Sequence, residues 1–277
     1  MILSYCNIAG PIAAWPSVRT SSIDLPCTVR RMRIEMGTSL VIEARAPSRA
    51  EAARAVSAAF SAAAQVARCL DPAERCGDLA RINAAAPGTS VPISAAALDV
   101  LRLAQRLNAR SGGVFDPCLP TRPGRMADLE LSEGEHPRAT PQRALEIDCG
   151  GIAKGYVVDV AVTVLQAAGC SAGLVNAGGD VRAFGGICAL LLRGPGASYR
   201  SVSLADAAVA VSDRDAPRAP SGHRGYYVRA GMAGARRYAA VRAPDAMTAD
   251  ALTKCLLLAP GAPPAALLAE FGAESLV

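Results

Sequence analysis

Aromatic residues make up only 4% of this 277-residue chain, and histidine occurs just twice, as His136 and His223. No run of basic residues is interleaved with aromatics, so the sequence does not support nucleic-acid binding, although the formal net charge is +5. Both histidines fall in polar loops without an evident partner, so we expect them at the surface and not in a Ser/His/Asp triad. No apolar run is long enough to form a transmembrane helix.

The nine cysteines form no CxxC pair, and their number is odd. Several lie in apolar stretches, as Cys188 and Cys255 do, which favours reduced, buried thiols and a cytoplasmic location. The first 18 residues are apolar but contain no basic residue before Arg19, whereas a secretory signal begins with a positive region. A truncated signal peptide at this end would instead indicate a periplasmic protein.

Lysine is the scarce cation of this chain. Of the 29 Lys and Arg residues, only Lys154 and Lys254 are lysines. Either this distribution is chance, or both positions need a compact ammonium group instead of a planar guanidinium group.

The chain is organised around one stretch, Asp148-Cys-Gly-Gly-Ile-Ala-Lys-Gly-Tyr-Val-Val-Asp159. Ala144 to Ile147 before it is typical of a short buried strand, and residues 157–168 show apolar residues at helical spacing. We therefore predict a strand, a turn at Gly150-Gly151 and a helix whose first turn contains Lys154. Unpaired N–H groups at such a helix start attract anions, phosphates especially. The glycine spacing matches neither a P-loop nor a dinucleotide-binding fingerprint.

A second candidate site lies near the C-terminus, where Thr248 is predicted to cap a helix from Ala249 to Ala259. Asp250 shares a face of this helix with Thr253 and Lys254, which follow it by three and four residues. A carboxylate and a hydroxyl together suit Mg²⁺. The alternative is an ordinary Asp–Lys pair near a helix start.

A third glycine-containing motif, Asn176-Ala-Gly-Gly-Asp180, follows a buried strand and is either a further backbone site for anions or a simple turn. Strands and helices do not alternate strictly along the chain, which favours the α+β class with mixed sheets over a doubly wound sheet. We expect a loosely ordered leader over residues 1–30 and a single domain over residues 31–277.

Periodicity, caps and turn residues predict the remaining elements. In chain order they are a hairpin over Val29–Arg45 with its turn at Met36-Gly37-Thr38, a helix from the Ser48–Glu51 capping box to about Leu70, an irregular stretch from Asp71 to Ala86, a helix from Ser94 to near Ser111, a loop from Pro120 to Arg143 around one strand at Leu129–Leu131, strands at Ile187–Leu192, Ala207–Val211, Tyr226–Ala230 and Tyr238–Ala243, and a short helix around Ala265–Phe271.

In their order along the chain, these motifs resemble those of the FAD:protein FMN transferase (ApbE-like) family. The central stretch is similar to the family's Asp-Leu-Gly-Gly-Ile-Ala-Lys-Gly-Tyr-Ala-Val-Asp, and the resemblance spans about residues 32 to 277. The other matching segments are Met36-Gly37-Thr38, Arg81-Ile-Asn83, Ser111-Gly-Gly-Val-Phe-Asp-Pro117, Val175-Asn-Ala-Gly-Gly-Asp180 and Ala249-Asp250-Ala-Leu252.

What the resemblance implies is an ApbE-like (T-fold-like) single domain that binds FAD with Mg²⁺ on its diphosphate. A Ser or Thr hydroxyl of an acceptor flavoprotein subunit attacks the FMN phosphorus, FMN becomes phosphoester-linked, and AMP leaves. By position, Asp250 and Lys154 are implied as catalytic residues, and Asp250, Thr253 and the carbonyl of Gly151 as metal ligands. The implied FAD contacts are Met36, Val114, Phe115, Asp116, Asp148, Lys154, Gly178 and Gly179.

The chain departs from the family pattern at several places. Cys118 replaces a Thr after Phe-Asp-Pro, and the stretch between Pro117 and Asp148 is shorter than expected. Lys254 stands where the metal motif has Thr, no aromatic between Phe60 and Phe115 replaces the flavin-stacking Tyr, and Tyr226-Tyr-Val-Arg-Ala230 stands where the family has His-Ile-Ile-Asp-Pro. Either Thr253 substitutes for the missing Thr, or the ammonium of Lys254 takes part of the metal's role.

Two functions that involve a nucleotide therefore stay open, beside a structural or regulatory role without flavin. The chain is either a divergent FMN transferase or a protein of the same fold that binds FAD or another nucleotide without transferring it. A diphosphate site requires the side chains of Lys154 and Asp250 to converge within a few Å in one place. The chain contains no Asp-Gly stretch followed by Gly-Ala-Thr, so we do not expect it to be an acceptor.

Overall fold

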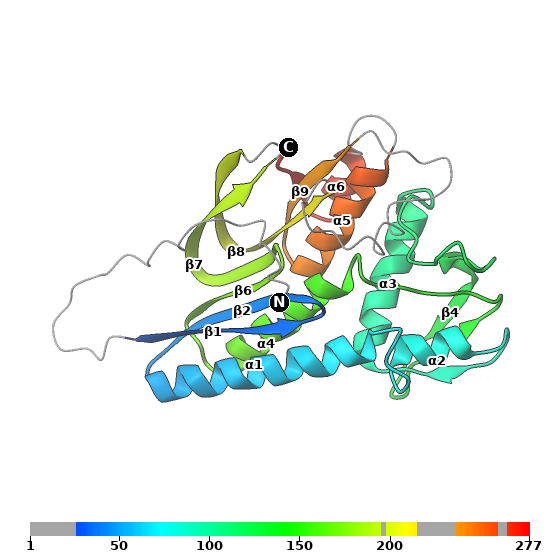
Figure 1. Ribbon diagram of the computed structural model, residues 1–277, viewed down its shortest axis with the longest axis horizontal. Helices are drawn as coiled ribbons and strands as arrows, with labels where there is room; N and C mark the ends of the chain where they lie inside the picture. Colours follow the sequence, from blue (N-terminus) through cyan, green and yellow to red (C-terminus); the bar gives the residue numbers. More distant parts are fainter. Residues whose placement is uncertain (1–25, 195–197, 215–235, 260–264) are drawn as a thin grey trace.

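Residues 26–194, 198–214, 236–259 and 265–277 are the part of the chain that the computed structural model describes (Figure 1). Its first element, β1 (Cys27–Glu35), begins four residues before the expected domain start at 31. The rest of the predicted leader, the strand predicted at Tyr226–Ala230 and His223 lie outside the described residues. His136 is exposed, as predicted.

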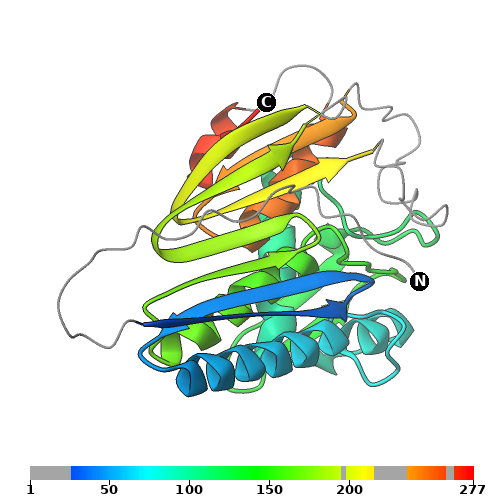
Figure 2. The ribbon, with the colours of Figure 1, turned by 60° about the vertical axis from the view of Figure 1, so that its left-hand side comes forward.

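A large sheet of seven strands forms the centre of the fold (Figure 2). Every pairing between its described strands is antiparallel, where the sequence predicted mixed sheets. Tight hairpin turns join the first two strands and the pair Ala172–Ala177 and Asp180–Arg193, and the long helical connection between these two hairpins brings the chain back in the opposite direction. In spatial order the strands are β1, β2 (Thr38–Ala46), β6 (Ala172–Ala177), β7 (Asp180–Arg193), β8 (Tyr199–Asp213), β9 (Tyr238–Ala243) and β10 (Glu274–Ser275).

Strands β7 and β8 extend well beyond the segments predicted at Ile187–Leu192 and Ala207–Val211. Their pairing shifts register between Ala183 and Ile187. Gly185-Gly186 lies at this shift, and a glycine pair interrupts the alternating pattern from which a strand is predicted. The shift lets one long strand bend instead of ending.

Three helices pack on one face of the large sheet, namely α1 (Arg49–Cys69), α4 (Ala153–Ala167) and α5 (Ala246–Leu258) (Figure 1). α1 begins at the predicted capping box: the Ser48 hydroxyl accepts the Glu51 N–H at 3.2 Å, and the Glu51 carboxylate accepts the Ser48 N–H at 2.9 Å. The side of α1 that faces the core is mostly alanine, which lets it lie close to α4.

A second layer lies beyond these helices and contains a three-stranded sheet. Its helices are α2 (Asp78–Ala84) and α3 (Ala95–Arg110); Ser94 caps α3 as predicted, because its hydroxyl accepts the Ala97 N–H at 3.1 Å. The region from Pro120 to Arg143, predicted as a loop around one strand, contains the short helix η1 (Met126–Asp128) and two strands. The strands of this sheet are β3 (Val91–Pro92), β4 (Leu129–Ser132) and β5 (Arg138–Pro141).

Two predictions in this layer were wrong. Helix α2 lies in the stretch predicted as irregular, and its residue Asp78 accepts the backbone N–H of Ser94 at 3.1 Å, a tertiary bond that periodicity cannot show. The strand predicted at Ala144–Ile147 is reduced to one bridge between Ile147 and Cys118. The amide of Asn83 takes its place, since it donates to the Ile147 carbonyl at 2.9 Å and accepts the Ile147 N–H at 2.8 Å.

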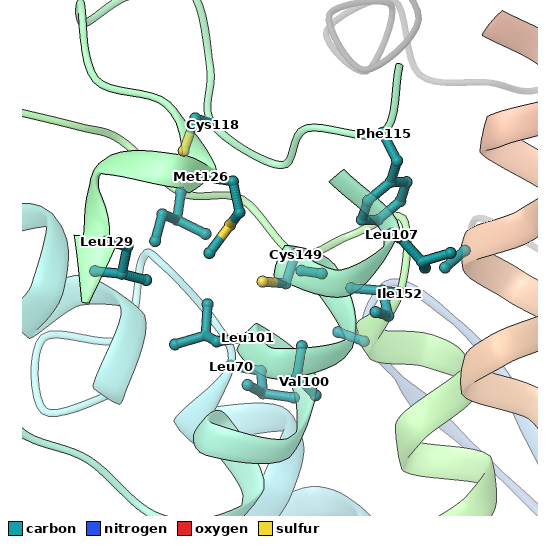
Figure 3. Packing of buried hydrophobic residues seen from close by; sticks show 14 of the residues in the cluster. Leu70, Val100, Leu101, Leu107, Phe115, Cys118, Met126, Leu129, Cys149 and Ile152 are labelled. Atoms are coloured by element: carbon teal, nitrogen blue, oxygen red, sulfur yellow. The ribbon is translucent and has the colours of Figure 1, made fainter. Parts of the chain in front are cut away.

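Buried apolar side chains form three clusters. The first lies between α3, the small sheet, α5 and the short helix α6 (Ala265–Glu270), and Figure 3 shows part of it. The second fills the space between the large sheet and helices α1 and α4. The third lies on the opposite face, because Leu174 belongs to it while the next residue of β6, Val175, belongs to the second. Within the described ranges, no helix is both long and apolar enough to cross a membrane.

Candidate functional site

Asp148 and the glycine pair after it form a tight turn that is anchored in the core. The Gly150 N–H donates to Oδ1 of Asp148 at 2.8 Å, which is the hydrogen bond of an Asx turn. Cys149 and Ile152, on either side of the glycines, are fully buried and lie among apolar side chains (Figure 3). The turn is therefore fixed on both sides and leads directly into α4, whose first turn contains Lys154.

The start of α5 is tied to α4. Asp245 caps α5, not Thr248 as predicted: its carboxylate accepts the Thr248 N–H at 2.7 Å, which lets the helix begin at Ala246. A second carboxylate, that of Asp159 in α4, accepts the N–H groups of Ala246 at 2.9 Å and Met247 at 2.8 Å. The donors left unpaired at a helix start are thus satisfied from a neighbouring helix.

Four charged side chains from α4, β7 and α5 meet near this turn. Nζ of Lys154 lies 3.1 Å from Oδ2 of Asp180 and 3.4 Å from Oδ2 of Asp250. The Lys254 ammonium donates to Oδ1 of Asp250, and the Gly155 N–H donates to Oδ2 at 3.2 Å. Lys154 and Asp250, which the diphosphate-site hypothesis requires to converge, do so. We call Lys154, Asp180, Asp250 and Lys254 the charge cluster.

Burial and pairing act against each other on the two carboxylates of the charge cluster. Burial raises the pKa of Asp180 to about 6, helped by the Asp250 carboxylate and opposed by Lys154 and Lys254. Burial also acts to raise the pKa of Asp250, but the two ammonium groups and the Gly155 N–H outweigh it, so this pKa lies below its ordinary value. Asp250 is therefore the permanent anion to which both lysines are paired.

Two hairpin turns lie side by side next to the charge cluster. Met36-Gly37 joins β1 to β2 and Gly178-Gly179 joins β6 to β7, and the four residues have φ values of 49°, 69°, 63° and 114°. Positive φ values at both central residues match the twist of paired strands, although they are uncommon for a residue such as Met36. The Gly178 N–H donates to the Ser39 carbonyl at 3.2 Å. The Gly178-Gly179 turn leads directly to Asp180 and so positions one carboxylate.

Replacing Gly178 by alanine should destabilise the protein by about 2 kcal/mol, because alanine costs about 1–2 kcal/mol in the left-handed region and meets a neighbour as well. A β-carbon at Gly178 would lie 2.4 Å from Oγ1 of Thr38. Gly88→Ala is the matched control, because Gly88 has φ +80° and open space around it. Urea unfolding of both variants separates the cost of the contact with Thr38 from the cost of the backbone strain. Equal losses in the free energy of unfolding would show that the contact costs nothing.

The segment after α3 that was predicted to line an FAD pocket is mostly anchored in the core. The ring of Phe115 is 4% exposed and packs in the first cluster near Leu107 (Figure 3). Val114 and Asp116 are half-buried, and Oδ1 of Asp116 accepts the Cys118 N–H at 3.0 Å. The structure thus gives Phe115 a packing role and leaves its neighbours partly exposed.

The predicted metal ligands are not all brought together. The Thr253 hydroxyl donates to the carbonyl of its own helix at Asp250, at 2.6 Å, and lies 2.7 Å from Oγ of Ser212. The stem of Lys254 instead lies against Gly151, since a β-carbon there would be 3.4 Å from Cγ of Lys254. Asp250 and Gly151 are therefore close to Lys254, and the Thr253 hydroxyl points elsewhere.

Sequence reasoning missed two carboxylates, Asp159 and Asp180. Asp180 is 2% exposed, and Asp159 pairs with Arg182 at 2.8 Å in addition to the start of α5. Asp159 is an acid inside an otherwise apolar segment, between Val158 and Val160, and Asp180 directly follows a glycine pair that ends a buried strand. A buried carboxylate needs partners, so this pattern was the available signal.

Asp159→Asn should destabilise the protein by about 2–3 kcal/mol, because an amide cannot accept all the donors and places its own NH₂ against one of them. The donors are Arg182 and the N–H groups of Ala246 and Met247. Asp245→Asn at the same helix start is the matched control, since Asn caps as well as Asp. Urea unfolding measures both; a smaller loss for Asp159→Asn than for the control would contradict the prediction.

Comparisons with known proteins agree with this arrangement. The sequence matches the model of the ApbE family over residues 36–122 and 121–276. The chain belongs to the ApbE family. A search of curated proteins found no match. Four of the motifs of this ApbE chain that resembled the family meet at the charge cluster and the adjacent hairpin turns, whereas Arg81-Ile-Asn83 and Ser111–Pro117 lie in the second layer.

Solved structures share the ApbE fold. The apo form of the flavinyl transferase ApbE from Pseudomonas stutzeri superposes with a TM-score of 0.72 at 20% identity, over 90% of each chain. The ApbE protein of Thermotoga maritima and the flavin transferase ApbE of Vibrio cholerae each give 0.72 at 19% identity, over 90% of this chain and 93% and 96% of theirs. The predicted α+β, ApbE-like single-domain fold is confirmed.

Proposed function

We propose that this ApbE-family protein is a flavin transferase that moves FMN from FAD to a Ser or Thr hydroxyl of an acceptor flavoprotein subunit. The observation that carries the proposal is the charge cluster, in which Lys154 and Lys254 are positioned by buried carboxylates beside the Gly150-Gly151 turn. Two of the similar ApbE structures are named flavinyl or flavin transferases, which supports the same reaction class.

In the proposed reaction the acceptor oxygen attacks the FMN-side phosphorus of FAD. A bond forms between that oxygen and phosphorus, the bond from phosphorus to the bridging oxygen breaks, and AMP leaves with the bridging oxygen. The hydroxyl proton passes to water. Phosphoryl transfer of this kind depends mainly on positioning and on charge stabilisation, because negative charge spreads over the phosphoryl oxygens.

The residues of this chain supply these two needs in a specific way. Gly150 and Gly151 carry no side chain, so the diphosphate can approach the backbone closely at the start of α4. The Lys154 side chain is 26% exposed, and we propose that its ammonium group, which also lies 3.4 Å from the Gly150 carbonyl, contacts a phosphate oxygen of FAD. Asp180 and Asp250 orient that ammonium from the buried side. Met36 and the Gly178-Gly179 turn are proposed to bound the same FAD site.

Mg²⁺, which the family resemblance implies at Asp250, Thr253 and the Gly151 carbonyl, does not fit the residues present. Both oxygens of Asp250 already face an ammonium group, and the Thr253 hydroxyl bonds elsewhere. Among the described residues, no group of three or more His, Cys, Asp or Glu side chains could bind a metal ion. The proposed transfer therefore contains no step through a metal.

One observation favours a second function, the binding of FAD or another nucleotide without transfer. With two lysines against two aspartates, the charge cluster has no surplus positive charge to stabilise the negative charge that develops on the leaving bridging oxygen in the transition state. Binding to the α4 start and the glycine turns does not require that surplus. The two functions differ in whether FMN leaves FAD.

The test is incubation of the purified protein with FAD and a peptide that contains an Asp-Gly stretch followed by Gly-Ala-Thr. We expect FMN mass on the peptide and release of AMP, both measured by mass spectrometry. Asp250→Asn should abolish the transfer, since it releases both lysines from their shared anion. A peptide with Ala in place of Thr is the control for the attacking hydroxyl.

The outcomes separate the two functions. Transfer that requires Asp250 and the peptide Thr supports the transferase. FAD binding, read by flavin fluorescence, without transfer supports the nucleotide-binding protein. If the protein neither binds FAD nor transfers FMN, both functions are contradicted and only the ApbE fold remains.

A further inference from the structure

Lys254 lies in the charge cluster as a buried cation instead of extending to solvent. Its side chain is 10% exposed, and that of its partner Asp250 is 0% exposed. A solvated Asp–Lys pair four residues apart on a helix needs no such burial, and burying both charges is costly unless each is compensated. Lys254 therefore compensates the Oδ1 side of this buried carboxylate, while Lys154 and the Gly155 N–H lie at Oδ2.

The stem of Lys254 also fills the space beside the glycine turn. A β-carbon at Gly151 would lie 3.4 Å from Cγ, 3.5 Å from Cε and 3.8 Å from Cδ of Lys254. The methylene groups thus lie beside Gly151 while the ammonium reaches Oδ1 of Asp250. A cation that bridged the Gly151 backbone and Asp250 would have to displace this side chain.

The charges of the cluster leave no place for a divalent ion. Lys154 and Lys254 balance Asp180 and Asp250, and both oxygens of Asp250 have ammonium partners. Mg²⁺ requires oxygen ligands in near-octahedral geometry and is repelled by a neighbouring ammonium group. Only two of the chain's 29 cationic residues are lysines, and both lie here, where a compact point charge is needed.

We infer that the ammonium group of Lys254 is the resident cation of this site and that it makes the protein independent of divalent metals. The inference deepens the proposed function, since it concerns the cofactor requirement of the same site, but metal binding can be measured without FAD or acceptor. It also predicts how a metal site could be created. Residue 254 shares a helix face with Asp250. If Lys254 is replaced by Thr, Oδ1 of Asp250 loses its ammonium partner and the new hydroxyl lies beside it, whereas the Thr253 hydroxyl points elsewhere.

The experiment is a titration of the unliganded protein with Mn²⁺, followed by electron paramagnetic resonance of the free ion and by thermal unfolding with Mg²⁺. We expect no specific Mn²⁺ binding and no Mg²⁺-dependent rise in Tm for the natural chain. Lys254→Thr should bind Mn²⁺ at least about tenfold more tightly than Lys254→Met, which removes the same charge without adding an oxygen ligand. Adding Asp250→Asn to Lys254→Thr should remove that binding.

Specific Mn²⁺ binding by the natural chain that Asp250→Asn abolishes would overturn the inference. A folded Lys254→Thr variant that binds no more Mn²⁺ than Lys254→Met would overturn it too. If the variants fail to fold, the titration of the natural chain still decides. A protein that fails to bind or transfer FAD yet shows these metal results would contradict only the proposed function.

Discussion

Gly155→Ala should give a large loss of stability, at about 3 kcal/mol or more, because overpacking against backbone has no cheap relief. A β-carbon at Gly155 would lie 2.2 Å from the Ala246 carbonyl oxygen and 2.7 Å from Cα of Met247. Alanine would gain up to about 1 kcal/mol of helix propensity in α4, which is too little to offset that clash. Helix α5 must therefore shift away from α4.

The shift should reach the charge cluster, because the Gly155 N–H donates to Asp250 at 3.2 Å. We expect urea unfolding to show the stability loss and flavin fluorescence to show weaker FAD binding in the same variant. Ala167→Ser, which adds one atom at an exposed position of α4, is the control and should change stability by about 0.5 kcal/mol or less. Comparable losses in the two variants would mean that α4 and α5 are not packed as closely as the structure shows.

The second large effect is expected from Asp250→Asn, at about 3–5 kcal/mol, since removing one partner of a buried ion pair strands the other charge. Here the stranded charge is that of Lys254, whose side chain is 10% exposed, with Lys154 beside it. Lys254→Met alone should cost less, because Asp250 keeps Lys154 and the Gly155 N–H as partners. The double variant should therefore be more stable than Asp250→Asn alone.

A double-mutant cycle measured by urea unfolding tests this, and we expect a coupling energy between Asp250 and Lys254 of about 1–3 kcal/mol. The control is the same cycle on Arg242 and Glu274, an ion pair at 3.2 Å whose side chains are 38% and 57% exposed. Exposed pairs of this kind contribute about 0–1 kcal/mol. Additive effects of Asp250→Asn and Lys254→Met would show that the two side chains are not paired.

Several elements could be predicted because their causes are local. The capping box that opens α1, the Ser94 cap of α3 and the glycine turn before α4 each depend on residues within a few positions of one another. The strand predicted at Ala144–Ile147 was wrong because the partner of Ile147 is an amide 64 residues away. The cap of α5 was assigned to Thr248 because sequence alone does not say which of two capping residues is used.

The residues of the candidate site likewise fall into those that the sequence identified and those that it missed. Sequence alone identified the glycine turn, the scarcity of lysine, Asp250 and the replacement of a family Thr by Lys254, since these are statements about residue type and spacing. Its motifs also indicated the ApbE family, and their order along the chain carried that inference. What a side chain pairs with is not a property of spacing, so Asp180 and Asp159 were missed although both close recognised motifs.

Only the tertiary structure decided which group pairs with the Asp250 carboxylate. The sequence left open whether the Thr253 hydroxyl or the Lys254 ammonium accompanies Asp250, because residues three and four positions on both share its helix face. The packing of α5 against β8 turns Thr253 toward Ser212, and the Gly151 turn leaves room for the Lys254 stem. The direction of a side chain on a helix face is set by its neighbours in space, which is why spacing alone did not show that Lys254, and not the Thr253 hydroxyl, pairs with the Asp250 carboxylate.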